Sequence, residues 1–135
     1  MPTPHPTPAP RTIWLSLLAD VVLVILFAAI GRASHDEGIL GENGLGLLQT
    51  SWPFVVSLLI GWAAMRLWRF PTAILNAGIS VWLYTVIGGM LLRGVSGQGV
   101  QMAFAIVTAI VLGLFLVGWR IVVALLARRR PRTDP

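Results

Sequence analysis

Four long apolar runs dominate this chain, at residues 13–31, 51–67, 73–92 and 102–127. The first run has 19 residues, and as a helix rising ~1.5 Å per residue it reaches ~28 Å, close to the ~30 Å hydrocarbon thickness of a bilayer. Lipid offers no hydrogen-bond partner to free backbone groups and the connections between runs are short, so helices are the expected spanning form. The sequence therefore predicts an all-α membrane protein with four transmembrane helices in a compact bundle.

The composition excludes an ordinary soluble domain. Of the 135 residues, 56% are hydrophobic and only 11% are charged, whereas about 25% of residues are charged in soluble domains. The mean hydropathy of +0.83 is correspondingly high. The chain contains no cysteine, which excludes disulfides and thiolate sites. We expect neither a metal nor a cofactor.

The flanks of the apolar region have a different composition. Proline alternates with other residues near the N-terminus, so residues 1–12 are predicted to form a disordered, polyproline-like tail. Residues 13–127 form the predicted four-helix domain, and residues 128–135 form a basic tail. The first apolar run partly resembles a secretory signal, but it is too long and contains Asp20, so we expect it to be retained.

All ten basic side chains are arginines, and their distribution predicts the orientation in the membrane. Seven of them lie before the first run, around the junction of the second and third runs, or after the fourth run; only Arg32 and Arg93 lie in the other two connections. Because cytoplasmic loops are enriched in basic residues, we expect both termini in the cytoplasm. The expected partner of this net charge of +5 is the lipid bilayer, through its anionic headgroups, and no nucleic-acid partner is expected.

Tryptophans and a proline mark the expected helix boundaries. Trp14, Trp52 and Trp68 lie at the ends of apolar runs, where indole rings favour the membrane interface. Ser51 is the expected N-cap of the second helix, with Pro53 in its first turn, where a missing N–H is harmless. The second helix is therefore predicted to begin at residue 51.

Asp20 places a carboxylate inside the first apolar run, six residues beyond Trp14 and so about 9 Å into the bilayer. An ionised aspartate near the bilayer centre costs about 2.5–3.5 kcal/mol on insertion scales, so a partner is expected. Arg120 lies eight residues before Arg128, about 12 Å in from the same membrane face. These matching depths predict an intramembrane charge pair between Asp20 and Arg120. The side chains that are candidates to line the same layer are Ser16, Trp62 and Ser80.

Three interpretations of this layer stay open at the level of sequence. In the first, the ion pair is structural and fixes which helices touch, so that loss of one partner leaves an uncompensated buried charge. In the second, the fourth helix ends near Arg120, whose side chain snorkels to the interface while residues 121–127 continue as a surface helix. In the third, Asp20 binds protons or ions in a transport path. Four short helices leave little room for alternating access, so this last interpretation calls for a homo-oligomer.

A polar cluster at the expected outer face follows the first run and consists of Arg32, His35, Asp36 and Glu37. A metal site or an acid–base site is one interpretation. Consecutive residues on a helix point to different sides, however, and one histidine without a second ligand motif is weak evidence for a metal. We therefore favour a solvated loop.

No hydrolase signature is present, because the sequence has no Ser-His-Asp set, no paired membrane aspartates and no HExxH motif. We therefore expect no enzymatic activity. The sequence favours a non-enzymatic structural or accessory membrane protein. The alternative is a small transporter or a proton or ion conduit that uses Asp20.

A faint internal duplication is visible in the apolar runs. A Gly-Trp pair occurs in the second run, at Gly61 and Trp62, and again in the fourth run, at Gly118 and Trp119. Two hairpins of the same orientation are one interpretation of this pattern, and coincidence is the other.

Several short phrases also occur in a defined order: FAAIGRASH closes the first run, SWPF and GW lie in the second, YTVIGGMLLRGVSGQG leaves the third, and GWR lies in the fourth. With this order and spacing, from about Leu18 to Arg120, the chain resembles a family of small bacterial, mainly actinobacterial, multi-pass membrane proteins known only as a domain of unknown function. The resemblance implies four helices and a location in the bacterial cytoplasmic (inner) membrane, with no assigned activity, ligand or partner. The positions that correspond to the family's motifs are Asp20, Gly31, Arg32, His35, Pro53, Phe54, Gly61, Trp62, Thr85, Gly88, Arg93, Gly97, Trp119 and Arg120.

Overall fold

The structure is a computed structural model that describes residues 7–35, 38–41 and 44–129. Within this part of the chain the long helices are α1 (Pro10–Ala33), α2 (Gly46–Ala64), α3 (Ser80–Val95) and α4 (Met102–Arg129). Two short elements lie between α2 and α3, the 3₁₀ turn η1 (Leu67–Arg69) and the π-helical segment η2 (Ile74–Ile79), which runs directly into α3. The described residues contain no strand.

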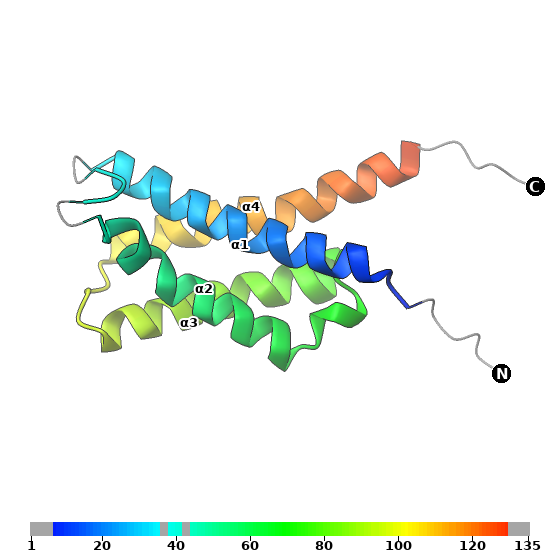
Figure 1. The fold of residues 1–135 in the computed structure, drawn as a ribbon, viewed down its shortest axis with the longest axis horizontal. Coiled ribbons are helices and arrows are strands. Elements are labelled where there is room, and N and C mark those ends of the chain that lie inside the picture. The colour runs from blue at the N-terminus through cyan, green and yellow to red at the C-terminus, as the bar shows by residue number, and fades with distance from the viewer. Residues whose placement is uncertain (1–6, 36–37, 42–43, 130–135) are drawn as a thin grey trace, which may run out of the picture.

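Each of α1, α2 and α4, and the continuous helix formed by η2 and α3, is long and apolar enough to cross a membrane. The predicted all-α architecture with four spanning helices is therefore confirmed. The ends of the helices gather at two opposite ends of the bundle (Figure 1). The basic end holds the start of α1, the link between α2 and α3 and the end of α4, whereas the loop end holds the α1–α2 and α3–α4 links.

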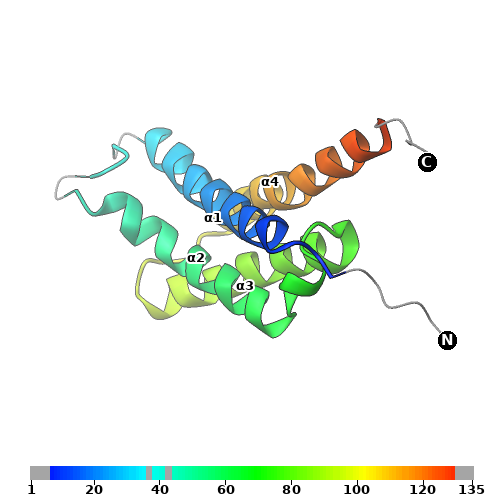
Figure 2. The same cartoon turned by 45° about the vertical axis from the view of Figure 1, so that its right-hand side comes forward.

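The four helices pack as a hairpin and a crossed pair. In both views α2 and α3 run side by side, while α1 and α4 lie against this hairpin and cross each other (Figures 1 and 2). Direct contacts between α1 and α4 occur at this crossing. A side chain on α1 can therefore meet one on α4 near the middle of both helices.

Glycines let α2 and α3 approach each other closely. A Cβ atom at Gly61 would lie 2.7 Å from the Cβ of Tyr84, and one at Gly89 would overlap the ring of Phe54. Lipid tails are as apolar as leucine, so helices associate in a bilayer through such close packing rather than through a hydrophobic driving force. The fit between α2 and α3 thus depends on the absence of side chains at these positions.

The buried core lies between the four helices, with contributions from η1 and η2. The side chains of Val24, Leu112 and Leu116 are fully buried. Phe27 meets Phe54 edge to face, with ring centroids 5.6 Å apart, which is a favourable geometry for two aromatic rings. The outward sides of the helices expose many leucines, isoleucines and valines, as a surface that contacts acyl chains requires.

The start of α2 differs from the prediction. The helix begins at Gly46, so Ser51 and Pro53 are buried residues inside it, and Ser51 is not its N-cap. A proline inside a helix removes one backbone hydrogen bond, which membrane helices tolerate where neighbouring groups satisfy the freed carbonyl. The guanidinium of Arg32 packs against this first turn, and a Cβ atom at Gly46 would overlap it.

The end of α2 and the start of α3 also differ from the expected boundaries. α2 ends at Ala64 rather than at residue 67, and Arg66 follows with a left-handed φ of 51°, a conformation that commonly ends helices. Beyond η1, the carbonyl of Ala73 accepts hydrogen bonds from both Ala77 and Gly78, at 3.2 and 3.0 Å. The chain therefore enters the third membrane segment through a widened turn.

The two flanks are partly helical. α1 begins at Pro10, a first-turn position where the missing N–H of proline is harmless, so residues 10–12 belong to the helix rather than to a tail. α4 stays helical through Arg129. Residues 1–6 and 130–135 of the predicted tails lie outside the described residues.

Candidate functional site

Asp20 of α1 and Arg120 of α4 meet where the two helices cross. Nη1 of Arg120 donates to Oδ1 of Asp20, and Nη2 donates to Oδ2, both at 2.8 Å. Both side chains are 0% exposed. This two-pronged geometry is the strongest form of carboxylate–guanidinium contact, and it joins two residues 100 positions apart in the sequence.

Two tryptophans complete the hydrogen bonding of the carboxylate. Nε1 of Trp62 on α2 donates to Oδ2 of Asp20, and Nε1 of Trp119 on α4 donates to Oδ1, each at 2.8 Å. A carboxylate has about four acceptor positions on its two oxygens. All of these positions are filled by N–H donors of α2 and α4, so Asp20 is fully satisfied without water.

The guanidinium of Arg120 is held by the backbone as well as by Asp20. Its Nε donates to the carbonyl of Pro71 at 2.9 Å, and its Nη1 donates to the carbonyl of Leu116 at 2.9 Å. Its Cζ also lies 4.4 Å from the centre of the Trp119 ring, which adds a cation–π contact. The arginine therefore ties α4 both to α1 and to the link between α2 and α3.

Burial makes this arrangement sensitive to the loss of either partner. Moving a charge from water into a protein interior costs several kcal/mol per ion, and this cost is offset only when the geometry and hydrogen bonding of the pair are good. Here the opposite charges cancel and the acceptors are filled. The snorkelling interpretation is wrong, because α4 continues without a break past Arg120 and the Arg120 side chain is fully buried.

The other residues expected in this layer take different roles. Trp62 is a direct donor to Asp20. Ser16 is buried one turn before Asp20, and Ser80 is half-buried at the start of α3. Within the part of the chain that the structure describes, no hydrogen bond joins either serine to Asp20 or Arg120. Neither serine therefore belongs to the hydrogen-bonded cluster.

An apolar layer separates the cluster from the loop end. It consists of the fully buried side chains of Val24, Leu112 and Leu116. A cavity of about 440 Å³ lies beyond this layer at the loop end, and a shallower groove of about 220 Å³ lies between α2 and α3. Neither Asp20 nor Arg120 lines the cavity or the groove.

The polar cluster predicted near the end of α1 is described only in part. Arg32 donates from Nε to the carbonyls of Gly38 and Ile39, at 3.1 and 3.0 Å, and from Nη1 to Oγ1 of Thr50 at 3.0 Å. His35 is exposed. Asp36 and Glu37 lie outside the described residues. Among the residues that are described, no three His, Cys, Asp or Glu side chains are grouped in a way that could hold a metal ion.

The comparison with protein families gives a clear match. A family described as "Protein of unknown function (DUF3054)" matches residues 17–123. This protein belongs to the DUF3054 family. The resemblance to a family of unknown function, inferred from short sequence phrases, is therefore confirmed. Neither the curated proteins nor the solved structures give a significant match.

The part of this DUF3054 protein that matches the family contains the complete cluster. Asp20 lies near the beginning of the matched stretch, Trp62 lies within it, and Trp119 and Arg120 lie near its end. The family match thus extends over the segments of α1, α2 and α4 that build the site, and over η2 and α3 between them.

Two members of the site in this DUF3054 protein were not expected from the sequence. The carbonyl of Pro71 belongs to a link whose path the sequence does not define. Trp119 is adjacent to Arg120, and neighbours on a helix normally point in different directions. The repeated Gly-Trp pair was the available signal, since Trp62 and Trp119 both donate to the carboxylate of Asp20.

Proposed function

We propose that this integral membrane protein is a non-enzymatic structural or accessory protein of the bacterial inner membrane, in which Asp20 and Arg120 lock α1 to α4. One observation carries the proposal: each oxygen of the buried carboxylate accepts one hydrogen bond from Arg120 and one from an indole. A carboxylate held in this way stabilises one helix arrangement. It has no acceptor position left for a transported ion or an exchanging water.

The surroundings of the pair favour a lock over a proton or ion conduit. A conduit needs a polar path to the carboxylate, whereas Val24, Leu112 and Leu116 form an apolar layer on the loop side. Transport through Asp20 would further require withdrawal of the donors on α2 and α4.

The proposed orientation has both termini in the cytoplasm. The arginines Arg11, Arg66, Arg69, Arg128 and Arg129 all lie near the basic end of the bundle. Positive charge marks the cytoplasmic side of membrane proteins. The lipid bilayer is the expected partner of this end, through its anionic headgroups.

A thermal-stability cycle tests the lock. The full-length protein in an uncharged detergent would be compared with Asp20→Asn, Arg120→Gln and the double variant. We expect each single change to cost about 3–5 kcal/mol, because it leaves a buried charge without its partner. The double variant should lose clearly less than the sum of the two, because residues in direct contact are energetically coupled.

Two controls make this test decisive. Arg69→Gln removes an exposed arginine and should change stability by at most about 0.5 kcal/mol. Proton flux into liposomes that contain wild type or Asp20→Asn should be equal to that of empty liposomes. A neutral or stabilising Asp20→Asn change, or a flux that depends on Asp20, would contradict the lock and favour the conduit.

A further inference from the structure

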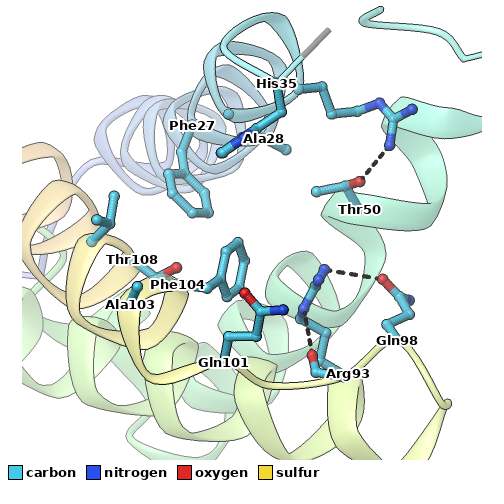
Figure 3. Close-up of a pocket in the computed structure, with 14 residues that line it drawn as sticks. Phe27, Ala28, His35, Thr50, Arg93, Gln98, Gln101, Ala103, Phe104 and Thr108 are labelled. Atoms are coloured by element: carbon cyan, nitrogen blue, oxygen red, sulfur yellow. Dashed lines mark hydrogen bonds between the residues drawn. The ribbon is translucent and has the colours of Figure 1, made fainter. Parts of the chain in front are cut away.

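The cavity of about 440 Å³ at the loop end is a second site, separate from the buried pair. It lies between the last turns of α1 and the first turns of α4 and is closed on one side by the α3–α4 link (Figure 3). Its volume falls within the range of about 300–1,000 Å³ that is typical of small-molecule sites. Val107 on its wall is 55% exposed, so the cavity reaches the apolar outer surface of α4, from which a lipid-soluble molecule can enter.

A buried hydroxyl without a partner lies on the wall of this cavity. Oγ1 of Thr108 makes no hydrogen bond to any described residue, and the residue is 0% exposed. Thr85 is equally buried, but its hydroxyl donates to the carbonyl of Val81 at 2.6 Å. Buried polar groups are normally paired, and an unpaired one destabilises a protein unless another molecule pairs with it. A ligand with a polar group can pair with Thr108.

Three groups of different chemistry share one face of α4 and of the residue that precedes it. They are the amide of Gln101, the ring of Phe104 and the hydroxyl of Thr108, and all three residues line the cavity. Residues three and seven positions apart lie on the same side of a helix. In Figure 3 the Gln101 amide and the Thr108 side chain both lie next to the Phe104 ring. The wall therefore presents an apolar ring between two groups that can form hydrogen bonds.

The opposite wall is also aromatic. Phe27 of α1 and Phe104 lie on either side of the cavity (Figure 3), and aromatic rings pack favourably against other rings. Gln101 and Thr108 are about 10 Å apart along the helix axis at ~1.5 Å per residue. Hydrogen bonds of about 2.8 Å at both ends leave about 5 Å between them. This length suits a six-membered ring that carries an oxygen at each of two opposite corners.

Two arginines on the cavity wall are engaged with the protein itself. Arg93 donates from Nε to the carbonyl of Gly99 and from Nη1 to Oε1 of Gln98, both at 3.1 Å. Arg32 donates to Oγ1 of Thr50 at 3.0 Å and also to backbone carbonyls. These bonds shape the wall and hold the α3–α4 link in place. Recognition of a ligand is therefore attributed to the uncharged groups of the cavity.

We propose that the loop-end cavity binds the ring of an uncharged, lipid-soluble quinone or quinol. The ring lies between Phe27 and Phe104, with one oxygen beside Thr108 and the other beside Gln101. The Thr108 hydroxyl donates to a quinone carbonyl or accepts from a quinol hydroxyl, and the Gln101 amide offers both a donor and an acceptor. The site thus accommodates either form of the ring, and the proposal concerns binding alone.

This proposal does not rest on the lock function. The apolar layer of Val24, Leu112 and Leu116 separates the cavity from the Asp20–Arg120 pair, and neither member of the pair lines the cavity. A stability cycle on the pair and a binding measurement on the cavity can therefore fail independently.

A pair of matched glycine variants tests the location of the ligand. Neither Gly31 on α1 nor Gly118 on α4 would place a Cβ atom within 4 Å of another group, so leucine is tolerated sterically at both positions. Gly31 lines the cavity and Gly118 does not. Gly31→Leu therefore fills the cavity, and Gly118→Leu is its control.

A pair of matched threonine variants tests the polar contact. Thr108→Val removes the unpartnered hydroxyl and keeps the shape of the side chain. Thr85→Val is its control, because Thr85 is equally buried but does not line the cavity. Without ligand, Thr108→Val should leave Tm unchanged or raise it, because it removes an unsatisfied group, whereas Thr85→Val should lower Tm, because it removes a hydrogen bond.

Calorimetric titration of the full-length protein in dodecyl maltoside measures binding. The probes are menadione, a quinone ring without a long tail, and 2-methylnaphthalene, which has the same fused rings but lacks both oxygens. We expect wild type, Gly118→Leu and Thr85→Val to bind menadione about ten-fold or more tightly than 2-methylnaphthalene. Gly31→Leu should bind menadione about ten-fold or more weakly than wild type, and Thr108→Val and Gln101→Leu each about three- to ten-fold more weakly.

Each outcome of these measurements decides a point. Equal affinity of wild type for the two probes would assign the cavity to an apolar occupant such as a lipid chain and would overturn the proposal. Equal binding of menadione by Gly31→Leu and Gly118→Leu, or no binding by wild type, would also overturn it. A fall in Tm for Thr108→Val as large as that for Thr85→Val would show that the Thr108 hydroxyl is already satisfied within the protein, which removes its proposed role.

Discussion

The Cδ atom of Arg120 lies 3.2 Å from the position that a Cβ atom would occupy at Gly78. Gly78 belongs to the π-helical segment η2, and its missing side chain leaves the space through which the arginine reaches Asp20. Arg120 has little freedom to move away, because four hydrogen bonds fix its guanidinium. The widened turn before α3 therefore contributes to the packing around the charge pair.

Gly78→Ala is therefore expected to destabilise the protein. The added methyl group overpacks the site at a cost of about 1–3 kcal/mol, which exceeds the gain of up to ~1 kcal/mol that alanine offers over glycine in a helix. Thermal unfolding in detergent measures the effect. Gly118→Ala is the control, because its methyl group meets no atom within 4 Å, and it should be neutral or stabilising. Equal Tm values for the two variants would show that Gly78 is not needed for access of Arg120 to Asp20.

The four spanning segments were predictable because hydropathy summed over about 20 residues is a strong signal. The charge pair was predictable in part, since Asp20 and Arg120 are costly in lipid unless they are paired and their depths match along α1 and α4. The sequence could not choose among the three interpretations of the layer. That choice depends on burial and on continuity of the helix past Arg120, which are properties of the packed bundle.

Other features depended on contacts that no local pattern encodes. Ser51 and Pro53 resemble the start of a helix, yet α2 begins at Gly46, where the guanidinium of Arg32 packs against the first turn. The loop-end cavity was not foreseen at all. It forms only when the ends of α1 and α3, including Arg93, meet the start of α4.

The two indoles that donate to Asp20 can be tested by substitutions that keep an aromatic ring. Trp62→Phe and Trp119→Phe each leave one carboxylate oxygen with a single donor, and we expect a loss of about 1.5–3 kcal/mol for each hydrogen bond to a charged acceptor. Thermal unfolding in detergent is the measurement. Trp62 should show the larger loss, because it is buried whereas Trp119 is only half-buried.

Trp82→Phe is the matched control for this comparison. Its indole donates at the same distance of 2.8 Å, but to the neutral backbone carbonyl of Ala109. A bond between uncharged groups contributes about 0.5–1.5 kcal/mol, so this variant should lose less stability. If Trp82→Phe were as destabilising as Trp62→Phe, the charge on Asp20 would contribute nothing special to the cluster.

The coupling energy between Asp20 and Arg120 should be nearly independent of salt. Ions screen charges in solvent over a Debye length of about 10 Å at 0.1 M ionic strength, but they screen buried pairs much less. The stability cycle on these two residues, repeated at about 0.05 M and about 0.5 M NaCl, measures this directly. A coupling energy that falls markedly at high salt would mean that solvent reaches the pair.

Cysteine labelling can determine which end of the bundle faces the cytoplasm, because the chain contains no cysteine of its own. Ser96→Cys places a thiol in the exposed α3–α4 link at the loop end, and Met65→Cys places one beside η1 at the basic end without removing an arginine. On intact spheroplasts a membrane-impermeant maleimide should label Ser96→Cys, whereas Met65→Cys should react only after permeabilisation.

This result is expected because five of the described arginines, Arg11, Arg66, Arg69, Arg128 and Arg129, lie near the basic end, and basic residues are retained on the cytoplasmic side. The reverse labelling pattern would place the loop end in the cytoplasm and would contradict the proposed orientation.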